Sequence, residues 1–222
     1  PAVAIGLWLL ALAPGGASSN AITHLCGGDS ALSITMTALS SLLIPFSIPL
    51  LLPVIMSDAV INMPLKTAVL QLLVVTFLPV LLAMLLKHYL TSKRMQNFYQ
   101  QAQRSSLWAL AVMVLITVSG NLIAMQQLFS IAALAVLLLC LLAMLLGLFV
   151  AKCIGGNKQL GKTFAVEVGI QNAGTAIFVA VVLLQQPELA LTPLLYGVLM
   201  NIPAALLIWL THQSNNKAII SE

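Results

Sequence analysis

The chain alternates long apolar runs with short polar interruptions. No Asp, Glu, Lys or Arg occurs in 1–28, 30–57, 67–86, 105–151, 168–187 or 189–216. Because roughly 20 apolar residues cross a bilayer as an α-helix, these runs predict membrane spans. Glycine, proline and charged residues divide them into seven spans, at approximately 2–26, 30–56, 64–88, 106–124, 128–151, 162–184 and 189–211. The pattern therefore predicts an all-α polytopic membrane protein.

Basic residues are concentrated on one side of these spans. Lys66 lies on the side where the chain starts, whereas the side reached after the first span carries Lys87, Lys93, Arg94, Arg104, Lys152, Lys158, Lys162 and Lys217. By the positive-inside rule this second side is the cytoplasm, so we expect a multi-pass protein of the cell inner (plasma) membrane with a cytoplasmic C-terminus. The polar segment 91–104 is predicted to lie at the membrane interface.

The composition supports this class. Hydrophobic residues make up 61% of the 222 residues and charged residues only 6%, too few to cover a water-soluble domain. The net charge of +4 follows from membrane topology, so no nucleic-acid partner is expected. Three cysteines lack a paired spacing and are interpreted as packing residues. Residues 1–13 resemble a signal-peptide core without a basic start, which favours a chain truncated inside a helical bundle.

Two of the predicted spans are interrupted. The first contains "PGGASSN" (14–20), and the sixth contains "QNAG" (171–174). An offset of five spans means that the two broken helices enter the membrane in opposite directions, and each is followed by one further span with prolines. This arrangement predicts inverted five-helix repeats with two discontinuous crossing helices. The second repeat would then be complete and the first would lack three helices, so that seven of ten helices are present in this chain.

The first break has the chemistry of an ion site. Pro14 removes a backbone donor and the two following glycines permit unwound backbone, while Ser18, Ser19 and Asn20 supply oxygens. The next span, which Asp29 is expected to cap, carries a hydroxyl stripe at Ser30, Ser33, Thr37 and Ser40 or Ser41. Neutral oxygens suit a hard monovalent cation. A simple proline kink, with the hydroxyls serving close helix packing, is the alternative.

Glu167 is the only carboxylate well inside a predicted span. A charge at the bilayer centre costs roughly 2.5–3.5 kcal/mol, so such a residue is usually functional. Gln171 lies at i+4 on the same helical face. One carboxylate favours Na⁺ over a divalent ion, and three scattered histidines provide no transition-metal site. Protonation of Glu167, or a pair with Lys162 near the cytoplasmic end, is the alternative.

Four stretches together resemble the bile acid:sodium symporter family, beginning at that family's fourth helix: "PGGASSN", "GGDSALSITMTALSSLLIPFSIPLL", "EVGIQNAGTA" and "LYGVLMNIPAAL". The resemblance implies ten helices in two inverted repeats that form a panel domain and a core domain. Residues 1–57 would then end the first repeat within the core domain. Residues 58–222 would form the second repeat, with a panel helix at 64–88 and core helices across 106–211.

The resemblance also implies site residues. Ser19, Asn20, Ser33, Thr37 and Glu167 stand where the family places one sodium site. A second would use Glu167, Gln171 and the carbonyls of Val168 and Ile170, and in the family it takes a further Gln from the third helix. We expect Asn172, Asn201 and Ser18 to bind substrate. Ala17 and Met200 depart from the residues common in relatives, which leaves the substrate open.

The expected function is a symporter that imports a small organic anion with Na⁺ by alternating access, with Na⁺ as coupling ion and no other cofactor. A proton-coupled carrier, or a uniporter or channel for small organic solutes, is the alternative. An intramembrane enzyme is not expected, because the sequence has no HExxH motif, Ser/His pairing or paired carboxylates.

Overall fold

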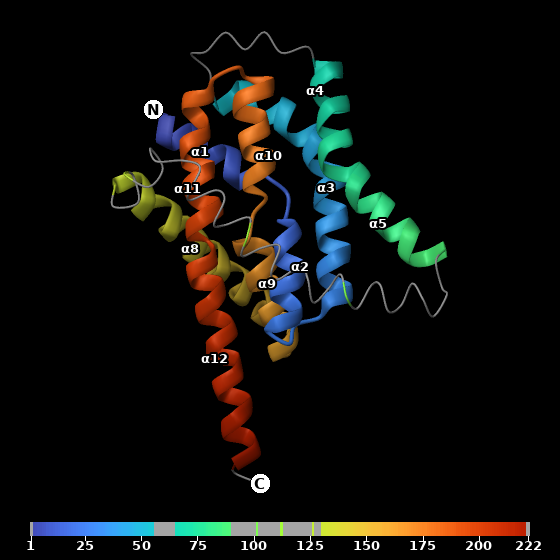
Figure 1. Cartoon of the computed structure of the whole chain (residues 1–222), viewed down its shortest axis with the longest axis vertical. Coiled ribbons are helices and arrows are strands. Elements are labelled where there is room, and N and C mark those ends of the chain that lie inside the picture. Colours follow the sequence, from blue (N-terminus) through green and yellow to red (C-terminus); the bar gives the residue numbers. More distant parts are fainter. Residues whose placement is uncertain are drawn as a thin grey trace.

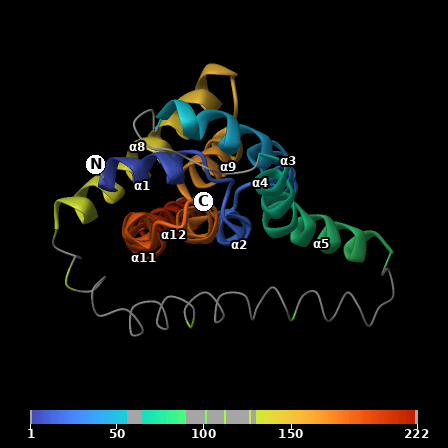
Figure 2. The same cartoon turned by 90° about the horizontal axis from the view of Figure 1, so that it is seen from above.

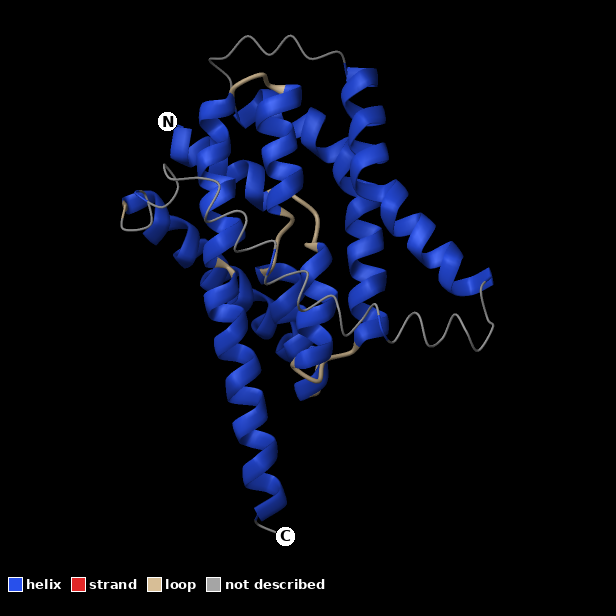
Figure 3. Cartoon of the chain, in the orientation of Figure 1, coloured by secondary structure: helices blue, strands red, loops and turns tan. Residues whose placement is uncertain are grey.

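The computed structural model of the chain describes residues 2–55, 65–89 and 130–220, together with the single positions 101, 112 and 126. The described part is built of helices and their connecting loops (Figure 3). The predicted fourth span, 106–124, and the polar segment 91–104 lie outside the described residues except at positions 112 and 101.

The elements in chain order are α1 (Ala2–Ala11), α2 (Ala17–Leu25), α3 (Ser30–Ile55), α4 (Leu65–Leu72), the π-turn η1 (Leu73–Phe77), α5 (Leu78–Tyr89), α8 (Ile131–Cys153), α9 (Lys158–Gly169), α10 (Ala173–Phe178), the π-turn η3 (Val179–Leu183), the 3₁₀ turn η4 (Pro187–Ala190), α11 (Leu191–Leu199) and α12 (Asn201–Ile220).

Four helical stretches of the described chain are long and apolar enough to cross a membrane: Ser30–Ile55, Leu65–Leu86, Ile131–Cys153 and Pro187–Gln213. They correspond to the second, third, fifth and seventh predicted spans. Many large apolar side chains on these helices are exposed, among them Leu50, Leu70 and Leu142, as expected for surfaces that face lipid. The prediction of an all-helical polytopic membrane protein is confirmed.

The first and sixth predicted spans are each split into two short helices. Helix α1 has 10 residues and is about 15 Å long, half of a bilayer core. It ends at Ala11, earlier than the predicted break at Pro14, because a proline disfavours helical backbone in the residue before it. Helix α9 ends at Gly169, and α10 begins after Asn172, whose Oδ1 accepts the Thr175 N–H at 3.1 Å.

The turn between α2 and α3 brings these two helices side by side. Gly27 has a φ of +65°, which favours glycine, and allows the chain to reverse. Asp29 then caps α3, as predicted, because its Oδ1 accepts the N–H groups of Ala31 at 2.9 Å and Leu32 at 3.0 Å. The hydroxyl stripe of α3 is thereby directed towards α2.

Helix α4 lies along α3, whereas α5 diverges from it (Figure 1). The change of direction follows the π-turn η1 and Pro79, two features that commonly kink helices. Seen from above, α9 lies in the interior of the assembly, between α8 and α3 (Figure 2). The contact with α8 is close, since a Cβ on Gly147 would lie 2.3 Å from the Phe164 carbonyl oxygen. This helix carries Glu167 into the centre of the fold.

Candidate functional site

The two breaks meet and run antiparallel. The Gly16 N–H donates to the Ile170 carbonyl at 2.8 Å, and the Asn172 N–H donates to the Pro14 carbonyl at 2.9 Å. Gly15 and Gln171 form the bridge between these two bonds. Backbone groups that leave a helix inside a bilayer need such partners, and each break supplies them to the other. The predicted meeting of residues 14–20 with 167–172 is confirmed.

The Glu167 carboxylate lies buried beside this crossing, with 5% of the residue exposed. Its Oε1 accepts the hydroxyls of Ser19 at 2.6 Å and Ser33 at 2.5 Å, and its Oε2 accepts the Thr37 hydroxyl at 2.8 Å. Three helices therefore converge on one carboxylate: α9 carries the acid, α2 supplies Ser19, and α3 supplies the other two hydroxyls.

Asn20 completes the cluster. The Ser33 hydroxyl also lies 2.7 Å from Asn20 Oδ1, and the Thr37 hydroxyl lies 3.5 Å from the same oxygen. All five residues predicted for the first ion site are therefore brought together by the fold. Their side chains offer carboxylate, hydroxyl and amide oxygens, and within the described ranges no three His, Cys, Asp or Glu side chains form a group able to hold a metal ion.

Lys162 does not neutralise this acid. Its Nζ lies 4.0 Å from the position of a Cβ on Gly27, so the side chain extends towards the α2–α3 turn. Over the described part of the chain, the partners of the Glu167 carboxylate are hydroxyl groups alone. The alternative of a Glu167–Lys162 pair is therefore wrong, and among the described residues the buried acid has no positively charged side chain as its partner.

Gln171 lies within the second break, between the end of α9 and the start of α10. Its Nε2 donates to the Val168 carbonyl at 2.7 Å, while its Oε1 is buried without a hydrogen-bond partner. The Ile170 carbonyl already accepts the Gly16 N–H. The four residues predicted for a second ion site, Glu167, Val168, Ile170 and Gln171, thus follow one another along the break, with one free acceptor at Gln171 Oε1.

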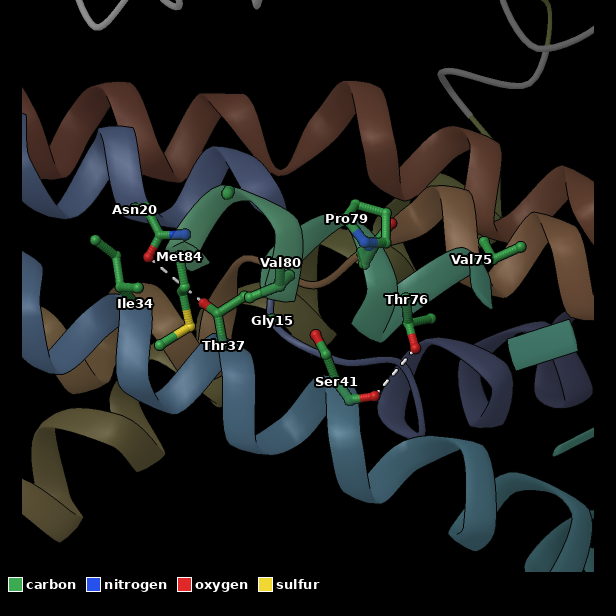
Figure 4. Close-up of a pocket in the computed structure, with 12 residues that line it drawn as sticks. Gly15, Asn20, Ile34, Thr37, Ser41, Val75, Thr76, Pro79, Val80 and Met84 are labelled. Carbon is green, nitrogen blue, oxygen red and sulfur yellow. Dashed lines mark hydrogen bonds between the residues drawn. The ribbon is translucent and has the colours of Figure 1, made fainter. Parts of the chain in front are cut away.

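A cavity of about 440 Å³ adjoins the Glu167 cluster. Gly15, Asn20 and Thr37 line it at one end, and Ser41 and Thr76 line it further along (Figure 4). The opposite wall is apolar and comes from η1 and α5, through Val75, Pro79, Val80, Ala83 and Met84. The cavity therefore lies between α3 and the diverging helix α5, and it shares residues with the cluster that holds Glu167.

Of the three residues expected to bind substrate, Asn172 lines this cavity. Ser18 and Asn201 are half-buried and are not among its lining residues. The Asn201 amide donates to the carbonyls of Gly197 at 2.8 Å and Val198 at 3.0 Å on the preceding turn. The fold thus brings one of the three predicted residues to the cavity.

Thr76 lines the cavity but was not singled out from the sequence. Its hydroxyl lies 2.8 Å from the Leu72 carbonyl and 3.1 Å from the Ser41 carbonyl, so it links η1 to α3. The sequence offers a weak signal at most, because Pro79 indicates a distorted helix but not which side chain faces a cavity. A single threonine in an apolar span does not by itself indicate a binding site.

Comparison with known proteins places these features in a wider group. Residues 1–128 match the Sodium Bile acid symporter family. The chain is 28% identical over 172 residues to an uncharacterised sodium-dependent transporter, YocS, of Bacillus subtilis (strain 168). The matched stretch covers 78% of this chain and 53% of YocS. It is 31% identical over 182 residues to the probable sodium/metabolite cotransporter BASS1, chloroplastic, of Oryza sativa subsp. japonica, covering 80% and 43% respectively. The chain spans about half the length of these relatives.

Proposed function

Because the chain belongs to the Sodium Bile acid symporter family, we propose that the protein containing it imports a small organic anion together with Na⁺ by alternating access. The relatives' descriptions as a sodium-dependent transporter and a probable sodium/metabolite cotransporter support sodium coupling. A carrier of this class requires an ion site, a substrate site next to it, and a physical link between the two.

The observation that carries the proposal is the buried carboxylate of Glu167. It is 5% exposed and accepts three hydroxyl groups, with no positive side chain beside it among the described residues. A buried unpaired charge is strongly unfavourable, so a bound monovalent cation would stabilise this arrangement. Na⁺ would be held by Ser19, Asn20, Ser33, Thr37 and Glu167, whose oxygens are the ligand type that a hard cation prefers.

A second Na⁺ would lie on the far side of the break. Gln171 Oε1 is buried and unpartnered. The Nε2 of the same side chain donates to the Val168 carbonyl, which therefore lies close to it. Glu167 and the Ile170 carbonyl would complete the part of this site that the chain contributes. A cation there would supply the partner that the Gln171 oxygen lacks.

The organic anion would bind in the cavity lined by Asn172, Thr76 and Ser41. Helix α2 begins at Ala17, directly after the lining residue Gly15 and the N-cap Gly16. The positive end of its dipole therefore favours a negatively charged group at this end of the cavity. The wall from α5 is apolar and suits the carbon skeleton of the substrate. Ser18 and Asn201 would contact the substrate in a different conformation of the transport cycle.

Coupling would arise because the two sites share residues. Thr37 and Asn20 belong to the Glu167 cluster and also line the cavity. A cation that fixes these side chains also fixes one end of the substrate site, so each ligand would bind more tightly in the presence of the other.

The antiparallel crossing at Gly15 and Gln171 supports inverted repeats, with 1–57 closing the first and 58–222 forming the second.

Basic residues support the proposed orientation. Lys152, Lys158 and Lys162 lie at the end of α8 and along the start of α9, the side that we propose faces the cytoplasm. The C-terminal helix α12 ends on this same side (Figure 1). The protein would then be a multi-pass component of the plasma membrane with a cytoplasmic C-terminus.

The test is the response of the purified intact protein to Na⁺. Its thermal unfolding temperature should rise on replacing KCl by NaCl at constant ionic strength, because a cation that binds only the folded state stabilises it. Glu167→Gln should abolish the rise, whereas Glu188→Gln, which alters an exposed acid in η4, should retain it. An unchanged sodium response in Glu167→Gln would show that this acid is not an ion ligand.

Proton coupling is the second candidate, because the only buried carboxylate among the described residues is itself titratable. The two candidates predict a different dependence of uptake on the pH gradient and on the cation present. Uptake into proteoliposomes that depends on the pH gradient, and is the same in NaCl and KCl, would favour the proton. Uptake of a carboxylate that requires NaCl at fixed pH would favour sodium.

A further inference from the structure

The Gly169 carbonyl lies at the point where α9 ends. In a continuous helix it would accept the N–H of Ala173, but that N–H donates to the Gln171 carbonyl at 3.0 Å instead. Helix ends leave such carbonyls without an intrahelical partner, and inside a membrane water does not replace it. The second break therefore needs a donor from elsewhere in the fold.

Two side chains provide it. The Tyr196 hydroxyl on α11 donates to the Gly169 carbonyl at 2.5 Å, and the Cys140 thiol on α8 donates to the same oxygen at 3.2 Å. Both residues are fully buried. One carbonyl is thus held between two helices that are distant in sequence from each other and from the break.

Packing against α8 also restricts this point. Gly169 lies against α8 so closely that a Cβ there would stand 2.1 Å from Cγ of Met144. The break has no room to move towards α8, and the two hydrogen bonds oppose movement away from Tyr196 and Cys140. Gly169 is therefore held both by packing against α8 and by two hydrogen bonds to its carbonyl oxygen.

The groups proposed to bind cations lie two residues away on each side. Glu167 precedes Gly169 and points at the hydroxyl cluster, while Gln171 follows it and keeps its Oε1 buried and unpartnered. Val168, Gln171 and Tyr196 also line a second cavity, of about 320 Å³, against α8. A rotation of the backbone at Gly169 would displace both cation-binding side chains together.

We propose that Tyr196 and Cys140 are positioning residues that set the sodium affinity of this segment by holding the Gly169 carbonyl. The inference rests on the proposed function, because it assumes that Glu167 and Gln171 bind Na⁺. Neither side chain touches the ion in this scheme. Tyr196 contributes the shorter bond, so its hydroxyl has the larger effect.

The experiment is a NaCl titration of thermal unfolding in the purified intact protein, with KCl keeping the ionic strength constant. Tyr196→Phe removes only the hydroxyl, and it should raise the Na⁺ dissociation constant fitted to the titration about three- to tenfold, the effect of losing one hydrogen bond. Cys140→Ala should raise it about twofold, and Cys140→Ser, which keeps a donor, should restore the wild-type value.

The matched control is Thr211→Val. It removes a buried hydroxyl that likewise donates to a carbonyl, that of Leu207 at 2.9 Å, but on α12. It should lower the unfolding temperature in KCl without changing the fitted Na⁺ dissociation constant. If Tyr196→Phe behaves like this control, its role is purely structural and the inference is wrong. If Tyr196→Phe does not fold, the Cys140→Ala and Cys140→Ser pair decides in the same way.

The two levels of the proposal fail differently. A wild-type protein that shows no response to Na⁺ contradicts the proposed function and this inference with it. A wild-type response that is unchanged in Tyr196→Phe and in Cys140→Ala contradicts the positioning role alone.

Discussion

Replacing Gly15 by alanine tests whether the backbone crossing sets the geometry of the Glu167 carboxylate. A Cβ on Gly15 would lie 2.8 Å from Glu167 Oε2 and 3.4 Å from the Thr37 hydroxyl oxygen. A carbon atom and an oxygen atom in ordinary contact are at least 3.4 Å apart, so the carboxylate or the crossing must move by roughly 0.6 Å. The φ of Gly15 is not positive, so the added methyl acts through space alone.

The carboxylate has little freedom to make this movement. Its two oxygens hold three hydroxyl groups at 2.5–2.8 Å, from Ser19, Ser33 and Thr37. A shift of this size weakens at least one of these bonds, and hydrogen bonds to a charged group contribute about 1.5–3 kcal/mol each. Taking the lower value, because the crossing can relax in part, we expect about tenfold weaker Na⁺ binding.

The assay is the NaCl titration of thermal unfolding, with Gly161→Ala as the matched control. Gly161 lies on the same helix as Glu167, and a Cβ there would meet Leu148 Cδ2 at 3.5 Å, an ordinary contact. Alanine should stabilise this helix by about 0.5–1 kcal/mol and leave the sodium response unchanged. A Gly15→Ala protein with the wild-type Na⁺ dissociation constant would refute the idea that the crossing positions the acid.

Three further substitutions separate substrate binding and folding from ion binding. Thr76→Val should raise the substrate KM several-fold in proteoliposome uptake while the sodium-dependent thermal shift persists, because Thr76 lines the cavity but does not touch Glu167. Gly147→Ala should destabilise the protein by about 1–3 kcal/mol in thermal unfolding, because its methyl would collide with the Phe164 carbonyl. Asn157→Ala should cost about 0.5–2 kcal/mol in the same measurement without altering the sodium response, since Asn157 Oδ1 caps α9 by accepting a backbone N–H at 2.9 Å.

Much of the fold follows from local sequence, because lipid leaves few options for an uncharged apolar run. The span predicted at 30–56 is the helix Ser30–Ile55, and that predicted at 64–88 is helical from Leu65 to Tyr89. Boundaries differ where a cap decides them. Helix α9 begins at Lys158 rather than 162, because the Asn157 side chain ends the preceding loop.

The hydroxyl cluster around Glu167 was predictable for a similar reason. Helical spacing puts Ser33 and Thr37 on one face of α3, and a lone acid in an apolar span requires an explanation. The contacts of Tyr196 and Cys140 were not predictable, since their common partner Gly169 is 27 and 29 residues away along the chain. Hydrophobic periodicity places a tyrosine or cysteine in a core without identifying which carbonyl it bonds.

The distribution of unmet polar groups supports the proposal that a cation, rather than the proposed anionic substrate, binds at the crossing. Four of the backbone groups freed by the two breaks are paired with each other, Gly16 with Ile170 and Asn172 with Pro14, and the Gly169 carbonyl accepts the Tyr196 hydroxyl and the Cys140 thiol. Two electron-rich groups remain buried there among the described residues: the carboxyl group of Glu167 and the unpartnered Oε1 of Gln171. An anion at this point would meet like charge, whereas a cation would satisfy both groups at once. The substrate is therefore expected in the adjoining cavity, whose lining residues Thr37 and Asn20 would couple its binding to that of the ion.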